Sequence, residues 1–308
     1  MAARGTNHMP HTTYTHPPIP GKLPQFIMPK GYALVCEGGG TRGFYSAGVF
    51  EAFMDAGIMF PYIIGVSAGA ANALTYIAGQ KLRSRQIVEY YVGDHRYVSK
   101  RNLLFHRSMF NLDFIFHTVP QKHIFFDWEI FQNCNVQFLT GAFNCITGET
   151  VWFEKKDITP GLEANIASAS VPILSPIVTY QGYQLLDGGI GAPIPIEKSI
   201  ADGNTFHVII LTRNQGYIKP PFQYKRLLKL FYKNNPAIID ALLHRHETYN
   251  RQLALCERLE REGKAIIIRP QQPLKITNTT GNHVPALLEL YDEGHAEGKE
   301  LVRQLHRF

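Results

Sequence analysis

The chain has 308 residues, of which 45% are hydrophobic, so it is long enough to bury the core of one large α/β domain. Its formal net charge is only +6, and no long run of the sequence concentrates the excess. A charge this modest and this dispersed argues against nucleic acid as the partner.

The first 30 residues carry prolines and scattered histidines but no apolar segment of signal-peptide type, and we expect a flexible leader outside the fold. From residue 31 the chain alternates short apolar runs with helical spacing. The expected order is a strand at 32–37, a helix at 42–57, a strand at 62–65 and a helix at 68–78. Such alternation predicts a mostly parallel sheet with helices on both faces. The apolar stretch 58–78 is not a membrane helix, because Pro61 and several polar and glycine residues interrupt it.

Residues 80–130 mix cations with aromatic side chains and predict an inserted helical cap with a basic face. The pattern then returns to alternation, with turn residues between the segments. We expect paired strands at 136–143 and 150–154, a helix from Pro160 through Ala169, a hairpin at 177–180 and 183–186, buried strands at 207–211 and 265–268, and helices within 222–263 and 285–306. The whole predicts an α/β fold of three layers.

The four cysteines, Cys36, Cys134, Cys145 and Cys256, form no CxxC pair. This usage predicts buried thiols in a reducing compartment, and therefore a cytoplasmic location. No group of His, Cys or Glu residues has metal-ligand spacing, so we expect neither a metal nor a cofactor.

A candidate nucleophile, Ser67, lies in Gly65-Val66-Ser67-Ala68-Gly69, between a predicted strand and a predicted helix. A serine hydroxyl reacts only when it is exposed on a strained turn beside a base, and glycines at positions 65 and 69 permit that turn. The pattern alone occurs by chance in about one chain in ten of this length. A glycine-rich helix start with Ser67 as its cap is the alternative. The strand before it and the helix after it favour the nucleophile.

A glycine loop, Gly38-Gly39-Gly40-Thr41-Arg42-Gly43, follows the first strand. Backbone N–H groups at the start of a helix are suitable donors to a developing oxyanion. The same residues satisfy GxGxxG, so a dinucleotide site is the alternative. The acidic residue that such a site needs about 20 positions on is missing, because Pro61 to Gly65 occupy that place. The loop therefore favours an oxyanion hole.

Three motifs in order, GGGTRG at 38–43, GVSAG at 65–69 and DGG at 187–189, make the chain resemble the patatin-like phospholipase family over about residues 31–213. The resemblance implies a three-layer α/β/α fold with a catalytic domain at 31–213, a cap insertion at 80–130, and a helical extension at 214–308 that completes the same domain. It also implies a carboxylic ester hydrolase acting on lipids. The implied site has Ser67 as nucleophile, Asp187 as proton acceptor, Gly38, Gly39, Gly40 and Arg42 around the oxyanion, and Gly65, Gly69, Gly188 and Gly189 as the remaining motif glycines.

The base of this site is open to two interpretations. A carboxylate with a reference pKa of about 3.9 is a weak base, but burial would raise the pKa of Asp187 and let it accept the serine proton. A Ser/Asp/His triad is the alternative, because His207 follows Asp187 in the chain order of α/β-hydrolases. His207 begins an apolar strand, however, which is more typical of a core histidine. We expect the Ser67/Asp187 dyad.

Residues 223–233 join cations to apolar side chains, as does a helix that lies on an anionic membrane. An ordinary surface helix with extended lysines is the alternative. Together with the basic cap, this segment favours a phospholipid or lysophospholipid substrate and peripheral membrane association. A catalytically silent lipid- or partner-binding protein of the same fold stays open as a second function, and a dinucleotide oxidoreductase as a third.

Overall fold

The structure is a computed structural model that describes residues 14–106, 108–273 and 282–305. Its main sheet has the strand order β10-β9-β2-β4-β5-β8-β7, and β6 pairs with β5. The strands are β2 (Tyr32–Cys36), β4 (Tyr62–Val66), β5 (Gln137–Asn144), β6 (Thr150–Glu154), β7 (Val178–Tyr180), β8 (Tyr183–Asp187), β9 (Phe206–Ile210) and β10 (Ala265–Ile268). Pairing is parallel from β10 through β5 and antiparallel beyond it. The predicted mostly parallel sheet and both predicted strand pairs are confirmed.

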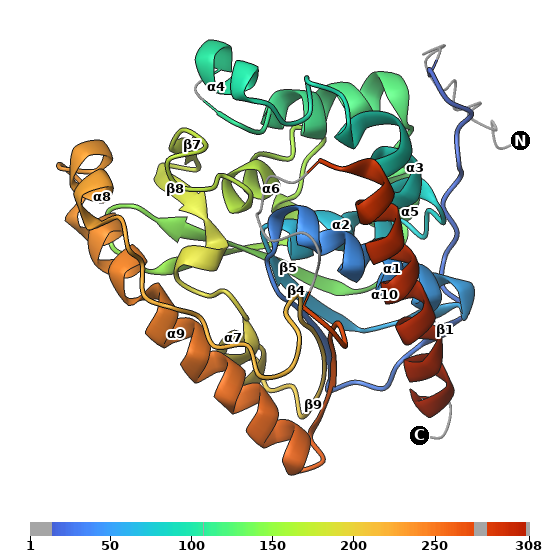
Figure 1. Cartoon of the computed structure of the whole chain (residues 1–308). Coiled ribbons are helices and arrows are strands. Elements are labelled where there is room, and N and C mark those ends of the chain that lie inside the picture. Colours follow the sequence, from blue (N-terminus) through green and yellow to red (C-terminus); the bar gives the residue numbers. More distant parts are fainter. Residues whose placement is uncertain (1–13, 107, 274–281, 306–308) are drawn as a thin grey trace, which may run out of the picture.

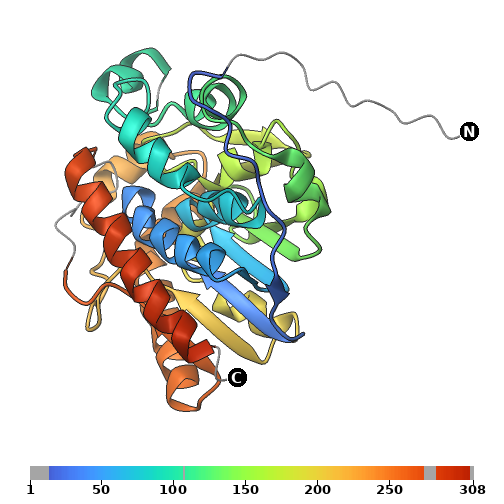
Figure 2. The same cartoon turned by 90° about the vertical axis from the view of Figure 1, so that its right-hand side faces the viewer.

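Helices cover both faces of this sheet (Figures 1 and 2). One face carries α1 (Phe44–Asp55), α2 (Ala68–Ile77) and α10 (Val284–Leu305), and the other carries α7 (Ile196–Ala201) and α9 (Pro236–Arg261). The three-layer fold is therefore as predicted. The helices expected within 222–263 are α8 (Lys225–Phe231) and α9, and Pro236 begins the second of them at its first turn.

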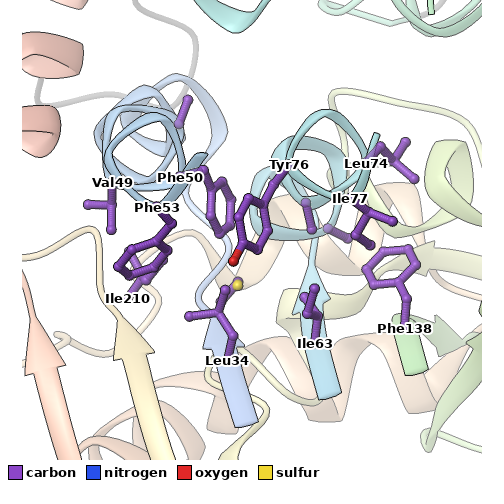
Figure 3. Close-up of a cluster of buried hydrophobic side chains, with 14 of the residues drawn as sticks. Leu34, Val49, Phe50, Phe53, Ile63, Leu74, Tyr76, Ile77, Phe138 and Ile210 are labelled. Carbon is purple, nitrogen blue, oxygen red and sulfur yellow. The ribbon is translucent and has the colours of Figure 1, made fainter. Parts of the chain in front are cut away.

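Alternation along the central strands builds a core on each side of the sheet. On β2, Leu34 and Cys36 face the core beneath α1 and α2, whereas Ala33 and Val35 face the core beneath α7 and α9. In the first core, the Phe50 and Tyr76 rings stack with their centroids 5.1 Å apart above the sheet residues (Figure 3). These two cores fix the strands whose ends carry the site. All four cysteines are buried and free, as predicted.

The C-terminal helix α10 packs backbone to backbone against α1. A Cβ atom placed on Gly48 would lie 2.0 Å from the carbonyl oxygen of Tyr291, and one on Gly294 would lie 2.1 Å from that of Tyr45. Only glycine allows this approach. The Tyr291 hydroxyl then donates to Glu51 across the same contact, at 2.8 Å. Residues 235–305 thus supply α9 to one face, α10 to the other and β10 to the edge of the sheet.

The segment between α2 and β5 forms the expected helical cap. It contains α3 (Arg83–Ile87), α4 (Lys100–His106), α5 (Trp128–Asn133) and two π-helical segments, Val88–Val92 and Phe114–His123. The prediction of a basic face is wrong for three of the expected cations, which are buried or paired with carboxylates. Arg83 is buried, Arg85 pairs with Glu89 and Asp292, and Arg96 pairs with Asp94. Another expected member of that face, Arg107, lies outside the described residues.

The described part of the expected leader, residues 14–30, belongs to the fold, so that part of the prediction is wrong. Its strand β1 (Phe26–Ile27) pairs in parallel with β3 (Ile58–Met59). The amide of Thr15 donates to the carbonyl of Lys122, and the amide of Gly21 donates to Asp127. Residues 1–13 lie outside the described part of the chain.

Candidate active site

The site lies where the carboxyl ends of neighbouring strands meet. β2 and β4 are parallel neighbours with Cys36 opposite Gly65, so Glu37 and Ser67 leave the sheet at the same edge. β5 then links Ser67 to Asp187, because Val66 pairs with Gly141 and the next residue, Ala142, pairs with Asp187. The register of three strands therefore brings together two residues that are 120 positions apart in the chain.

Ser67 occupies a strained turn between β4 and α2. Its φ of 53° and ψ of −128° are unusual for a residue with a side chain, and such an outlier is typical of functional turns. The motif glycines on either side make the turn sterically possible. A Cβ atom on Gly65 would lie 2.8 Å from the amide nitrogen of Ala70, and one on Gly69 would lie 2.6 Å from the carbonyl oxygen of Glu37. The turn therefore needs glycine at both positions, as the motif suggests.

The hydroxyl of Ser67 donates to Asp187 Oδ2 at 2.7 Å. Asp187 ends β8, and its other oxygen, Oδ1, accepts the amide of Gly189 at 2.7 Å, in the short 3-10 turn that Gly188 begins. Burial raises the pKa of Asp187 above its usual value, while the Ser67 hydrogen bond, the charge of Arg245 and the Gly189 amide act in the opposite direction. The direction agrees with the expectation from sequence.

Ser168 supports the turn, a role that sequence reasoning did not identify. Its hydroxyl accepts the amide of Ser67 at 2.8 Å and donates to the carbonyl of Gly141 at 2.6 Å. Because the amide of Ser67 is engaged in this way, it is not free to bind an oxyanion. Ser168 ends α6 (Glu163–Ser168) and belongs to none of the three sequence motifs, so no sequence signal indicated it.

The glycine loop lies directly against the nucleophile. A Cβ atom on Gly38 would be 3.1 Å from Cβ of Ser67, and Gly39 packs on Thr212, where its Cβ would be 2.9 Å from Oγ1. The amide of Gly38 is 3.4 Å from the carbonyl oxygen of Pro193, to which it donates. Gly40 begins the 3-10 turn that continues into α1. The loop thus presents its backbone beside the Ser67 hydroxyl.

Glu37, which precedes this loop, and Arg42, which belongs to it, are both buried. Glu37 accepts the amide of Thr212 through Oε2, which ties the end of β2 to the segment after β9. Burial lowers the pKa of Arg42, with the charge of Arg213 acting in the same direction and that of Glu37 opposing it. Within the described part of the chain, Nε of Arg42 has no hydrogen-bond partner.

A first cavity, of about 130 Å³, leads from Ser67 beneath the cap, and we call it the cap cavity. Its walls are mostly apolar and come from α2 and from the cap, including Leu74, Phe110, Leu112, Ile115, Phe116 and Phe126. Among the residues that the structure describes, Arg83 is the one cation in this wall, and it donates to the carbonyl of Phe125 and to Thr75 and lies over the ring of Phe126. The cap cavity is therefore suited to a hydrocarbon chain.

A second cavity, of about 510 Å³, opens on the other side of Ser67, and we call it the basic cavity. Ser67, Asp187 and the glycine loop line its base, together with Glu37. Its remaining walls come from residues 171–173, from the turn after β8, from the segment after β9, from α8 and from α9. Four cationic side chains of the described residues line it, namely Arg42, Arg213, Lys219 and Arg245, together with His246. Of these, sequence reasoning identified only Arg42, since the others belong to no motif.

His207 is not part of the site. It lies at the amino end of β9, opposite Ala33, whereas Ser67 follows the carboxyl end of β4. His207 is buried, its Nδ1 is 3.2 Å from the Ser199 hydroxyl, and burial lowers its pKa to about 4. The expected core histidine is therefore what the structure contains. The described residues include no group of three or more His, Cys, Asp or Glu side chains able to hold a metal ion, and no helix long and apolar enough to cross a membrane.

Two known proteins, one curated and one with a solved structure, are similar to this chain. The curated protein YjjU of Escherichia coli K12, described as uncharacterized, is 26% identical over 288 residues, which are 89% of this chain and 77% of that protein. Among solved structures, VipD from Legionella pneumophila is similar over 89% of this chain, at 13% sequence identity and a TM-score of 0.40. The match covers 66% of the VipD chain, just under two thirds of it.

Two family models match the chain. A domain of unknown function, DUF6363, matches residues 235–308, which include α9, β10 and α10. The patatin-like phospholipase model matches residues 34–200, more than half of the chain, and includes Ser67, Asp187 and the glycine loop. Membership of that family supports lipid acyl hydrolysis in general terms. The chain belongs to the patatin-like phospholipase family.

Proposed function

We propose that this protein is a serine acyl hydrolase that cleaves the carboxylic ester bonds of lipids through an acyl-Ser67 intermediate. The observation that carries the proposal is the 2.7 Å hydrogen bond from the Ser67 hydroxyl to Asp187 at a strained strand-to-helix turn. A hydroxyl on such a turn, bonded to a buried carboxylate whose pKa is raised, has the geometry of an activated nucleophile.

In the first half of the reaction, Ser67 Oγ attacks the ester carbonyl carbon and its proton passes to Asp187 Oδ2. The negative charge that develops on the carbonyl oxygen needs preorganised donors. Because the amides of Ser67 and Gly38 are engaged, those of Gly39 and Gly40 are the favoured donors in the loop. As the carbon–oxygen bond breaks, the leaving alcohol takes the proton from Asp187 and the acyl group stays on Ser67.

In the second half, a water molecule attacks the acyl-enzyme and gives its proton to Asp187. The bond to Ser67 Oγ then breaks, Ser67 regains a proton, and the fatty acid is released. The acyl chain fits the apolar cap cavity, and the alcohol part of the substrate then lies in the basic cavity. A phospholipid or lysophospholipid is the substrate class that this division favours.

A fluorophosphonate probe tests the proposal, because it modifies only an activated serine. We expect wild-type protein to be labelled and Ser67→Ala to be unlabelled, with hydrolysis of a short-chain ester falling about 10⁴-fold or more. The folded state of the variant is checked by its melting temperature. Absence of labelling in folded wild type would instead favour the second candidate, a catalytically silent lipid-binding protein of the same fold.

Helix α8 favours association with an anionic membrane as part of this function. It exposes Leu230 and Phe231, 74% and 54% accessible, among its lysines, and it begins beside the residues that line the mouth of the basic cavity. Exposed apolar side chains flanked by cations are typical of interfacial helices. We expect the wild type to float with anionic liposomes at low salt and the Leu230→Ser/Phe231→Ser variant to float less. Equal flotation of the two would contradict this role for α8.

A further inference from the structure

The basic cavity carries more positive than negative charge. Three guanidinium groups and the Lys219 amine face it, against the carboxylates of Glu37 and Asp187. Both carboxylates already accept protein donors, Glu37 from Thr212 and Asp187 from Ser67 and Gly189. Even with both carboxylates ionised, the cationic side chains among the described lining residues give the cavity a net positive charge.

The contacts of the cations confirm that no carboxylate neutralises them directly. Among the residues that the structure describes, none of Arg42, Arg213, Lys219 and Arg245 forms an ion pair within 4.0 Å. Arg213 lies over the ring of Tyr217 and Lys219 over that of Tyr249, at 4.5 and 5.4 Å. These cation–π contacts hold the two side chains in place without adding a negative charge beside them.

Two further observations support a bound anion. Arg42 lines the cavity and is 7% exposed, and its buried Nε has no hydrogen-bond partner in the described chain. Burial lowers the pKa of Lys219 to about 7, and repulsion from Arg245, Arg213 and Arg42 contributes although Glu37 opposes it. Cations that repel one another in a cavity are stabilised when an anion binds among them.

We propose that the basic cavity binds the phosphate group of an anionic lipid headgroup while the ester carbonyl lies at Ser67. The inference rests on the proposed hydrolase function and names its substrate class, a lipid whose headgroup has a net negative charge. Planar guanidinium groups bind phosphate oxygens in pairs, and several converging cations favour a group with more than one charge. A choline headgroup adds a cation and is therefore a poorer fit. Three of the four cations lie outside the family's glycine motif, two of them on the 212–220 segment and one on α9.

Two substrates that differ only in the phosphate test the proposal. We compare kcat/KM for 1-oleoyl lysophosphatidate and for 1-oleoyl glycerol in micelles of a neutral detergent. We expect wild type to favour the lysophosphatidate, and Lys219→Met and Arg213→Gln each to lower the ratio of the two values about 10- to 100-fold, the range for a lost charged hydrogen bond. Two variants at separate positions guard against a single misfolded protein.

Lys299→Met and Arg261→Gln are the matched controls, because both residues are exposed, on α10 and α9 respectively, and neither lines the cavity. They remove the same charges from the surface and should leave the ratio at the wild-type value. A ratio that falls equally in cavity and control variants would show that charge acts only by attracting the micelle, and would overturn the proposal. An unchanged ratio in the cavity variants would also overturn it.

Direct binding separates this inference from the proposed hydrolysis. Calorimetry on Ser67→Ala should give a Kd for lysophosphatidate that Lys219→Met weakens about 10-fold or more, whether or not the wild type turns over. If the protein binds lysophosphatidate in this way but does not hydrolyse it, the proposed hydrolase function is refuted and the proposed anion site stands. Inorganic phosphate alone binding as tightly as the lipid would assign the cavity to a free anion, and would overturn the headgroup assignment. No binding of either probe would overturn the site itself.

Discussion

The two cavities that meet at Ser67 both contain buried arginines, but these arginines have different surroundings. In the cap cavity, Arg83 donates to Phe125 and Thr75 and contacts the Phe126 ring. In the basic cavity, Nε of Arg42 has no partner in the described structure, and Arg213 makes a ring contact but no ion pair. A buried arginine whose donors have protein acceptors supports the fold, whereas a buried donor without an acceptor has lost its hydration without compensation.

The cavities also differ in the part of the chain that encloses them. The cap, inserted between α2 and β5, encloses the apolar side, while the 212–224 segment and α9 enclose the basic side. The region matched by the model of unknown function, residues 235–308, thus contributes Arg245, His246 and Tyr249 to the wall. We infer that one insertion selects the acyl chain and the C-terminal region selects the headgroup.

The largest effect is expected at the point that both cavities share. Asp187→Asn removes the proton acceptor but keeps the shape of the side chain, so kcat should fall about 10³- to 10⁴-fold for every substrate, whatever its chain or headgroup. Burial disfavours the charge of Asp187, so the neutral replacement should leave the melting temperature within a few degrees of wild type.

His207→Ala is the control for this prediction, since His207 lies at the opposite end of the strands. It should keep fluorophosphonate labelling and the wild-type substrate order, with at most a lower melting temperature from the space it leaves. If His207→Ala instead loses labelling while Asp187→Asn keeps it, His207 and not Asp187 is the base, which supports the triad.

An intermediate effect is expected in the cap cavity alone. Ile115→Trp adds volume to its apolar wall, so kcat/KM for long-chain esters should fall about 10-fold or more while that for short-chain esters changes little. Leu104→Trp is the matched control, because Leu104 is 77% exposed on α4 and lines neither cavity. A chain-length profile of hydrolysis measures the difference. If Ile115→Trp and Leu104→Trp give the same profile, the acyl chain does not occupy the cap cavity.

Much of the fold could be predicted because local pattern and final position agree. The apolar runs at 32–36 and 62–66 end at glycine-rich turns, and these features alone indicate parallel strands with a site at their carboxyl ends. The segment at 14–30 could not be placed, because backbone hydrogen bonds to Lys122 and strand β3 hold it and no periodic pattern precedes them. The basic face failed for a similar reason, since Arg85 pairs with Asp292, 207 residues away.

The candidate site divides in the same way. Ser67, Asp187 and the glycine loop lie in motifs, so their proximity could be predicted without any structure. Lys219 and Arg245 lie in a loop and on a long helix, and only the packing of α9 against the sheet brings their charges to Ser67. Their convergence depends on tertiary contacts, which local spacing does not encode.

The smallest effect is expected from the charge that links the basic cavity to the base. Arg245 lowers the pKa of Asp187 against the larger effect of burial, and it donates to the carbonyl of Gly189. Removing that charge in Arg245→Gln should raise the pKa of Asp187, leave less carboxylate at a given acidic pH, and move the acid limb of kcat/KM to higher pH by less than about one unit. The profile is measured with a neutral short-chain ester, so that headgroup binding does not contribute. Arg245→Lys keeps the charge and should return the acid limb to nearly its wild-type position. A limb that stays in place in Arg245→Gln, or moves to lower pH, would show that the basic cavity and the base act independently.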